Sequence, residues 1–123
     1  YKIDNTHFFV IANASNRDKD LAHLRTQAHL QGLDVEIEEV FSQCGILALQ
    51  GPSAFPLLTS LIPEVQALKP MRFLSLSDKE DFFVSRTGYT GAGGFELYGS
   101  ADRILEWWDI LIDKGQAYGI QPV

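Results

Sequence analysis

The amino-acid sequence predicts an α+β fold, a mainly antiparallel sheet with helices packed on it, and three observations lead to this class. The predicted elements follow one another in the order β, α, β, β, α, β, β, β, α. Neighbouring strands are joined by short polar turns, which is typical of hairpins. The 123 residues are 46% hydrophobic, which suffices for a core, so we expect a single domain over residues 1–123.

The first two predicted elements are a strand and a helix. The segment His7–Asn13 ("HFFVIAN") is aromatic and β-branched and ends in a polar residue, as a buried strand does. In the helix that follows, Ser15 and Asp18 match a capping box, and Gly32 supplies the C-terminal stop. Three apolar residues recur on one helix face: Leu21, Leu24 and Ala28.

A hairpin and a second helix are expected next. The segment Asp34–Val40 alternates apolar and acidic residues, and the largely apolar Gly45–Gln50 is its expected partner strand. A helix is then predicted over Gly51–Ile62, with glycine and proline in the positions typical of a helix start. Pro56 argues against this helix if the proline lies beyond the first turn, because proline lacks the backbone N–H that donates a helical hydrogen bond there.

The remaining sequence predicts three strands and a last helix. The strands are Arg72–Ser77, Asp81–Tyr89 and Phe95–Gly99, with the polar turn Asp78–Glu80 between the first two. Ser100 is the expected N-cap of the helix, and Gly115 ends it.

This last helix carries an apolar stripe formed by Ile104, Trp108 and Leu111. The stripe predicts that Trp108 is buried and that Trp107 is less buried.

Charge and composition exclude several classes of partner. The net charge is −6 and the ten Lys and Arg residues are scattered, so we expect neither nucleic acid nor a membrane as a partner. No apolar run approaches the ~20 residues that cross a bilayer. Cys44 is the single cysteine and cannot form an internal disulfide, which fits a reducing compartment. Because the first residue is Tyr1 rather than Met, we expect a segment of a longer polypeptide.

The sequence does not show the pattern of a metal site or of a catalytic nucleophile. His23 and His29 are six residues apart, whereas two metal ligands on one helix face need i, i+4 spacing. There is no G-x-S-x-G elbow, and Cys44 has no histidine beside it in sequence. We therefore expect no metal.

The glycine-rich segment Arg86–Leu97 ("RTGYTGAGGFEL") is the most unusual stretch of the chain. It contains neither G-K-[ST] nor the order strand, G-x-G-x-x-G, helix, so it is not a phosphate loop. One interpretation is a hairpin turn in which the glycines only supply positive φ angles. The other is a loop beside a ligand site.

Two polar residues in apolar segments favour a ligand site. Asn13 ends a predicted strand and Glu96 is one residue into another, and burial of such groups is costly unless each finds a partner. A carboxylate accepts paired hydrogen bonds from an N–H and an adjacent amino group, so Glu96 suits the edge of a pterin-like heterocycle. Tyr89 is a candidate aromatic wall. A second interpretation stays open, because strand alternation places Glu96 opposite Phe95 and Leu97 and toward solvent.

Three segments, in the same order, resemble the aminomethyltransferase family, the T-protein of the glycine cleavage system. They are "ANASNRDKDLAHL" (Ala12–Leu24), "LALQGPSA" (Leu47–Ala54) and "SRTGYTGAGGFELY" (Ser85–Tyr98), and the resemblance extends over essentially all 123 residues. One departure is clear. Where the family has acidic residues after "GYTG", this chain has Ala92 and Gly93.

The resemblance implies a tetrahydrofolate site in a folate-binding type of domain. The positions matching Asn13 and Glu96 contact the pterin, the position matching Tyr89 lines the pocket, and Ile11 is a further candidate. We therefore predict that Asn13, Tyr89 and Glu96 converge on one cavity.

The implied reaction moves the one-carbon unit of the aminomethyl-lipoyl H-protein to tetrahydrofolate and releases ammonia. The compartment would be the cytoplasm in a bacterium or the mitochondrial matrix in a eukaryote. In the family a key acidic residue lies just before the position of Tyr1, and a folate-contacting arginine lies just after that of Val123. We therefore expect no catalytic residue within this segment and no activity from the segment alone.

Two other parent proteins stay open at this point. The same folate-binding module occurs in sarcosine and dimethylglycine dehydrogenases and in a related demethylase. A noncatalytic relative is the folate-binding protein of iron–sulfur cluster maturation. These parents differ from the T-protein in regions outside residues 1–123.

Overall fold

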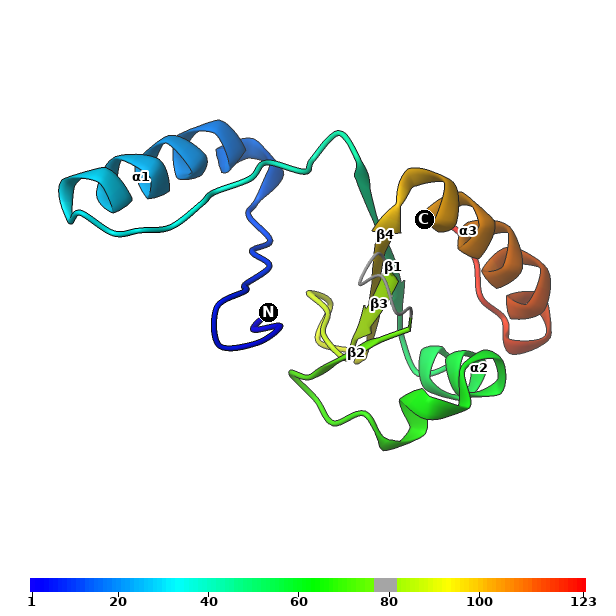
Figure 1. Ribbon diagram of the computed structural model, residues 1–123. Coiled ribbons are helices and arrows are strands. Elements are labelled where there is room, and N and C mark those ends of the chain that lie inside the picture. The colour runs from blue at the N-terminus through cyan, green and yellow to red at the C-terminus, as the bar shows by residue number, and fades with distance from the viewer. Residues whose placement is uncertain (77–81) are drawn as a thin grey trace. The chain divides into compact units, whose positions relative to one another are not determined.

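The computed structural model describes residues 1–76 and 82–123 (Figure 1). The chain forms two compact units, a first unit of Tyr1–Val40 and a second unit of Phe41–Val123, and each is described by itself. Within the described residues, a four-stranded antiparallel sheet and three α-helices confirm the predicted α+β class. The predicted turn Asp78–Glu80 and the adjoining ends of its two strands, Ser77 and Asp81, lie outside the described residues.

The first unit contains the predicted helix, α1 (Arg17–Leu30), preceded by a short 3-10 turn, η1 (Ala14–Asn16). Gly32 ends the helix as predicted. Its φ is 63°, its N–H bonds to the carbonyl of His29 over 3.1 Å, and the N–H of Leu33 reaches back to Ala28 over 3.0 Å. The predicted capping box is wrong. The η1 turn makes Asn16 the N-cap, with no side-chain cap bond.

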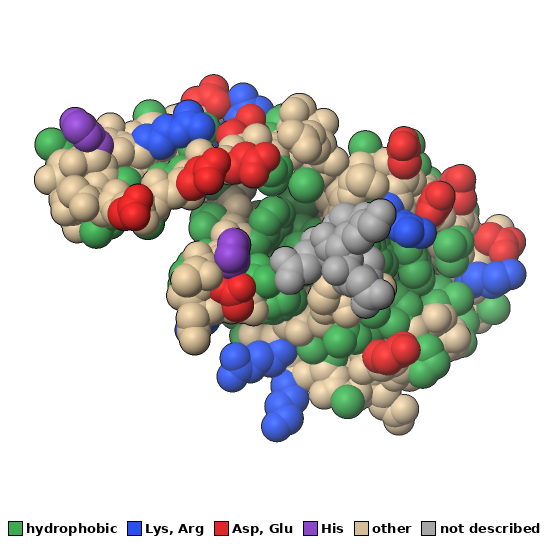
Figure 2. Space-filling view, in the orientation of Figure 1, with side chains coloured by type: hydrophobic (Ala, Val, Ile, Leu, Met, Phe, Trp, Pro, Cys, Tyr) green, Lys and Arg blue, Asp and Glu red, His purple; other side chains and the backbone are tan. Residues whose placement is uncertain are grey.

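The two strands predicted for the first unit do not form ladders. Of His7–Asn13, only Phe8 pairs, in an isolated antiparallel bridge with Lys2. The segment Asp34–Val40 forms no strand and runs back along α1, so the predicted hairpin with Gly45–Gln50 is wrong (Figure 1). No residue of this unit is buried, and apolar and charged side chains share its visible surface (Figure 2).

The second unit is built on one antiparallel sheet with the strand order β1-β4-β3-β2. The long pair joins β1 to β4, from Cys44 opposite Ser100 to Gln50 opposite Gly94. Four strands make up this sheet: β1 (Cys44–Gln50), β2 (Phe73–Ser75), β3 (Phe82–Ser85) and β4 (Gly94–Ser100).

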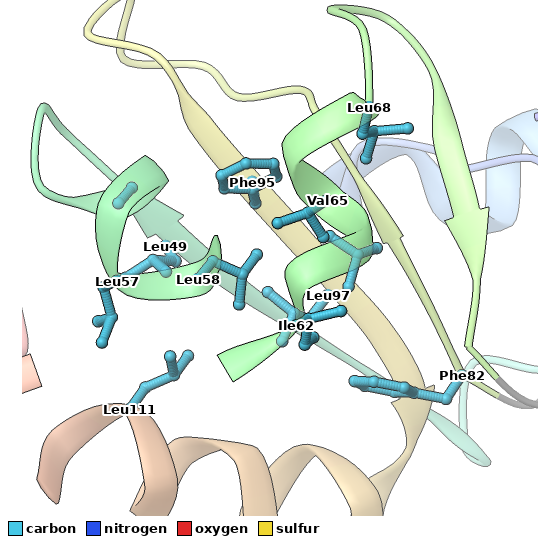
Figure 3. Packing of buried hydrophobic residues seen from close by; sticks show 12 residues of the cluster. Leu49, Leu57, Leu58, Ile62, Val65, Leu68, Phe82, Phe95, Leu97 and Leu111 are labelled. Carbon is cyan, nitrogen blue, oxygen red and sulfur yellow. The ribbon is translucent and has the colours of Figure 1, made fainter. Parts of the chain in front are cut away.

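Helices cover one face of this sheet and enclose the core. Leu57 and Leu58 of α2 and Leu111 of α3 point toward sheet residues that include Leu49 and Leu97 (Figure 3). The helical segments are α2 (Ala54–Leu61), η2 (Pro63–Ala67), α3 (Ala101–Gly115) and η3 (Gln116–Tyr118).

Local signals predicted both α-helices, but α2 begins at Ala54 after the N-cap Ser53, so the predicted helix start at Gly51 and Pro52 is wrong. Pro56 is the third residue of α2, within the first turn, where its missing N–H has no helical partner to lose. The Ser100 side chain accepts a hydrogen bond from the N–H of Arg103, so the predicted N-cap of α3 is confirmed.

The predicted order of burial of the two tryptophans is wrong. Trp107 is half-buried and stacks on Phe82, with ring centroids 5.5 Å apart, whereas Trp108 is 41% exposed. The face of α3 that meets the sheet is centred on Leu111 and lies toward Trp107, which leaves Trp108 at its edge.

Candidate functional site

The candidate site lies on the face of the sheet opposite the helices. Along β4, Phe95 and Leu97 are buried in the core, so Glu96 and Tyr98 project from the other face. The register of β3 and β4 sets Ser85 opposite Glu96. Strand alternation therefore gathers polar side chains from two adjacent strands at one place.

Four residues form a hydrogen-bonded group that we call the carboxylate cluster: Ser85, Thr87, Glu96 and Tyr98. The hydroxyl of Thr87 donates a hydrogen bond to Oε2 of Glu96. The Tyr98 hydroxyl donates to the same oxygen over 3.0 Å. Oγ of Ser85 lies 2.5 Å from Oγ1 of Thr87. Because the single hydroxyl proton of Thr87 is directed at the carboxylate, the Ser85 hydroxyl is the donor in this last pair.

The cluster is held by well-packed neighbours. Ser85 is fully buried, and Tyr98 is 2% exposed. The ring of Tyr98 stacks on Phe83 with centroids 4.6 Å apart, and Phe73 meets Phe83 edge-on at 5.7 Å. Such packing restricts the tyrosine ring, so its hydroxyl approaches Glu96 from a defined direction.

The two oxygens of Glu96 differ in their surroundings. Both hydrogen bonds end on Oε2, and Oε1 has no hydrogen-bond partner among the residues that the structure describes. Glu96 is partly buried, and within residues 1–76 and 82–123 the only buried side-chain polar atom without a partner belongs to Thr59. Oε1 therefore reaches the protein surface, where it can accept a hydrogen bond from a ligand.

The glycine-rich loop between β3 and β4 is attached to the end of β1 by Gln50. The amide Nε2 of Gln50 donates to the carbonyls of Phe95, over 3.0 Å, and Thr87, over 3.4 Å. Its Oε1 accepts from the Thr90 hydroxyl over 3.3 Å. A Cβ at Gly88 would meet this amide, so any other residue there would have to displace the Gln50 side chain from its hydrogen bonds.

Positive φ angles account for the other glycines of the loop. Gly91, Gly93 and Gly94 have φ of 74°, 76° and 154°. The hairpin interpretation and the site interpretation of this loop are therefore compatible, because the turn that needs these glycines also carries Thr87 and Tyr89.

The predicted site residues are divided between the two units. Glu96 belongs to the carboxylate cluster, and Tyr89 lies in the loop of the same unit with 79% of its surface exposed. Asn13 and Ile11 lie in the first unit, just before η1, and both are exposed. The convergence of Asn13 with Tyr89 and Glu96 on one cavity stays a prediction.

Sequence reasoning missed three members of the carboxylate cluster and the loop anchor Gln50. A period of two along the hairpin was the available signal, because it sets Thr87 with Ser85 and Tyr98 with Glu96. The contact of Gln50 with Phe95 joins residues 45 positions apart, and no local sequence pattern predicts it.

The structure also shows what the rest of the described surface offers. Two shallow hollows of about 240 and 370 Å³ lie against α1 and between η2 and α3, and none of the four predicted site residues lines them. Residues 1–76 and 82–123 contain no cluster of three or more potential metal ligands. No helix in these ranges is long and apolar enough to cross a membrane.

Comparison with known proteins shows the family. The GCVT N-terminal domain family matches residues 1–123, so the chain belongs to this family. The chain is 40% identical to "Aminomethyltransferase" of Bacillus subtilis (strain 168), over 99% of this chain and 34% of that protein. The protein of the same name from Chlorobium chlorochromatii (strain CaD3) is 38% identical over 100% of this chain and 34% of its own length. The chain thus spans about a third of the length of these curated relatives.

Proposed function

We propose that residues 1–123 are part of an aminomethyltransferase of the glycine cleavage system. The parent protein would transfer the one-carbon unit of aminomethyl-lipoyl H-protein to tetrahydrofolate and release ammonia. The family membership and the relatives named aminomethyltransferase support this proposal. The structural observation that carries it is Glu96, a fixed carboxylate with one oxygen at the surface.

The acceptor that the site offers fits a pterin. The edge of a pterin presents an N–H and an amino group, and an ionised carboxylate is an acceptor for both. Oε2 of Glu96 already accepts two hydrogen bonds, so Oε1 is the oxygen available for the substrate. In this proposal Asn13, Tyr89 and Ile11 complete the pocket around the heterocycle.

The residues of this chain would bind and orient the substrate and would not carry protons. None of them is assigned a catalytic role. Holding two reactants in a productive geometry can supply roughly 7 to 11 kcal/mol of the barrier. A carboxylate fixed by two hydrogen-bond donors suits such a role, because its direction is set before the substrate arrives.

The names of the relatives support aminomethyltransferase over the other two parents considered, a folate-dependent dehydrogenase or demethylase and a noncatalytic iron–sulfur maturation protein. We further propose that residues 1–123 alone do not catalyse the transfer, because they span about a third of these relatives.

Calorimetric titration of tetrahydrofolate into the full-length protein tests the proposal. Glu96→Gln should weaken binding about ten- to a hundred-fold, at a cost of about 1.5 to 3 kcal/mol, because an amide has one acceptor oxygen and its NH2 group must face either the donors of the substrate or the hydroxyls of Thr87 and Tyr98. Glu106→Gln is the matched control, since Glu106 is exposed on α3 and pairs with Arg103. Unchanged affinity of Glu96→Gln would contradict the role of Glu96, and transfer by the 123-residue chain alone would contradict its proposed inactivity.

A further inference from the structure

We infer that Thr87 and Tyr98 are positioning residues that present Oε1 of Glu96 to the substrate. The inference rests on the proposed function, because it concerns the same site. Both hydroxyls donate to Oε2, so they distinguish two oxygens that are chemically identical in a free carboxylate. The oxygen left at the surface is the one that can meet a ligand.

The direction of the protons in the cluster supports this role. The Thr87 hydroxyl donates to Glu96, so its oxygen accepts from the buried Ser85 hydroxyl. The series of hydroxyl hydrogen bonds therefore ends at the carboxylate of Glu96, which accepts the last of them. A hydrogen bond to a charged group is shorter and stronger than one between neutral groups, so each donor restrains Glu96 appreciably.

The backbone around the two donors is also fixed. Gln50 donates to the carbonyl of Thr87, which attaches this residue to the end of β1. Tyr98 lies within β4, opposite Phe83 in the sheet register, and its ring stacks on that of Phe83. Tyr98 therefore belongs to a strand of the sheet and Thr87 to a loop that Gln50 contacts, and a group held by its neighbours loses less freedom when a ligand binds.

The arrangement defines the class of ligand group that fits. A surface oxygen of an ionised carboxylate accepts hydrogen bonds and repels acceptors and anions. Oε1 therefore selects a ligand edge that carries N–H donors, and one oxygen can accept from two neighbouring donors. The fixed rotation of the carboxylate sets the angle at which that edge must approach.

Variants of Thr87 in the full-length protein test the inference. We expect Thr87→Val to weaken tetrahydrofolate binding about ten-fold and Thr87→Ser to restore it to within about three-fold of the wild type, because serine keeps the hydroxyl. Tyr98→Phe should weaken binding about three- to ten-fold. It provides a second, independent measurement if Thr87→Val does not fold. A thermal melt of each variant separates lost binding from lost structure.

Thr59→Val is the matched control for the same chemical change. Oγ1 of Thr59 is buried without a hydrogen-bond partner among the described residues, so its replacement should leave tetrahydrofolate binding unchanged. Wild-type affinity in both Thr87→Val and Tyr98→Phe, together with weakened Glu96→Gln, would overturn the positioning role and leave the proposed function standing. Equal losses in Thr87→Ser and Thr87→Val would also overturn it. Wild-type affinity of Glu96→Gln would overturn the proposed function and the inference with it.

Discussion

Both units of this chain contain apolar side chains, but among the described residues only the second unit buries them. In the second unit, residues such as Leu57, Leu58 and Leu97 are fully buried. In the first unit no residue is buried, and Phe8 and Leu30 are 63% and 72% exposed. An apolar pattern predicts which face of a helix or strand can pack. That face becomes buried only when another helix or strand covers it.

In the second unit, helices and strands of the unit itself cover one another's apolar faces. Its four strands bond to one another, and α2 and α3 cover one face of the sheet (Figure 3). In the first unit, a hydrogen bond of 3.3 Å from Arg25 to the carbonyl of Ile37 joins α1 to the segment that returns along it. We therefore expect the free energy of unfolding of the chain to come mainly from packing within Phe41–Val123.

The largest expected effect comes from removing a core side chain. Leu97→Ala should lower the free energy of unfolding by about 2 to 5 kcal/mol, because it leaves a cavity among fully buried neighbours. Leu30→Ala in the first unit should change it by less than about 0.5 kcal/mol, since surface substitutions usually do. Urea denaturation of the 123-residue chain measures both. Similar losses in the two variants would contradict the contrast between the units.

A smaller effect is expected from two glycine substitutions. Gly88→Ala should destabilise the chain by about 1 to 3 kcal/mol, because the new methyl group displaces the Gln50 amide from its hydrogen bonds. Gly32→Ala in the first unit meets no atom within 4 Å, so it should cost only about 1 kcal/mol for its φ of 63°. Thermal melts of both variants compare packing strain with backbone strain. A smaller loss of stability in Gly88→Ala than in Gly32→Ala would show that Gln50 does not hold the loop in place.

The smallest effect concerns a turn in the first unit. Oδ1 of Asp4 accepts hydrogen bonds from the backbone N–H groups of Thr6 and His7, over 2.6 and 2.8 Å, and these contacts hold the pKa of Asp4 well below its usual range. The backbone bond to Thr6 is the largest cause, and the His7 side chain is the next.

Because the pKa of Asp4 is lowered in the folded turn, the turn is fully stabilised above the ordinary carboxyl range and loses this support as the pH falls through the lowered value. An NMR titration of the Asp4 carboxyl carbon should show this low pKa, and His7→Ala should bring it part of the way back. An ordinary pKa for Asp4 in the wild type would mean that this turn is not formed in solution.

Local signals in the sequence determined several elements of this protein. Ser100 caps α3 and Gly32 ends α1, because a cap needs only a few adjacent residues. Alternation along β4 likewise sets Glu96 apart from Phe95 and Leu97, because successive side chains of a strand face opposite ways. Both kinds of signal are complete within one short segment.

Only the tertiary structure determined which of these segments pack against or pair with another segment. Asp34–Val40 alternates as a strand should, yet it forms none, because a strand exists only when a neighbouring strand bonds to it. Trp107 rather than Trp108 meets the core, because the exact rotation of α3 depends on Phe82 and the sheet beneath it. The partners of Glu96 were likewise settled by the register of β3 and β4, which brings Thr87 to a carboxylate nine residues away. Such contacts join distant or opposed segments, so their free energy depends on residues that no local pattern contains.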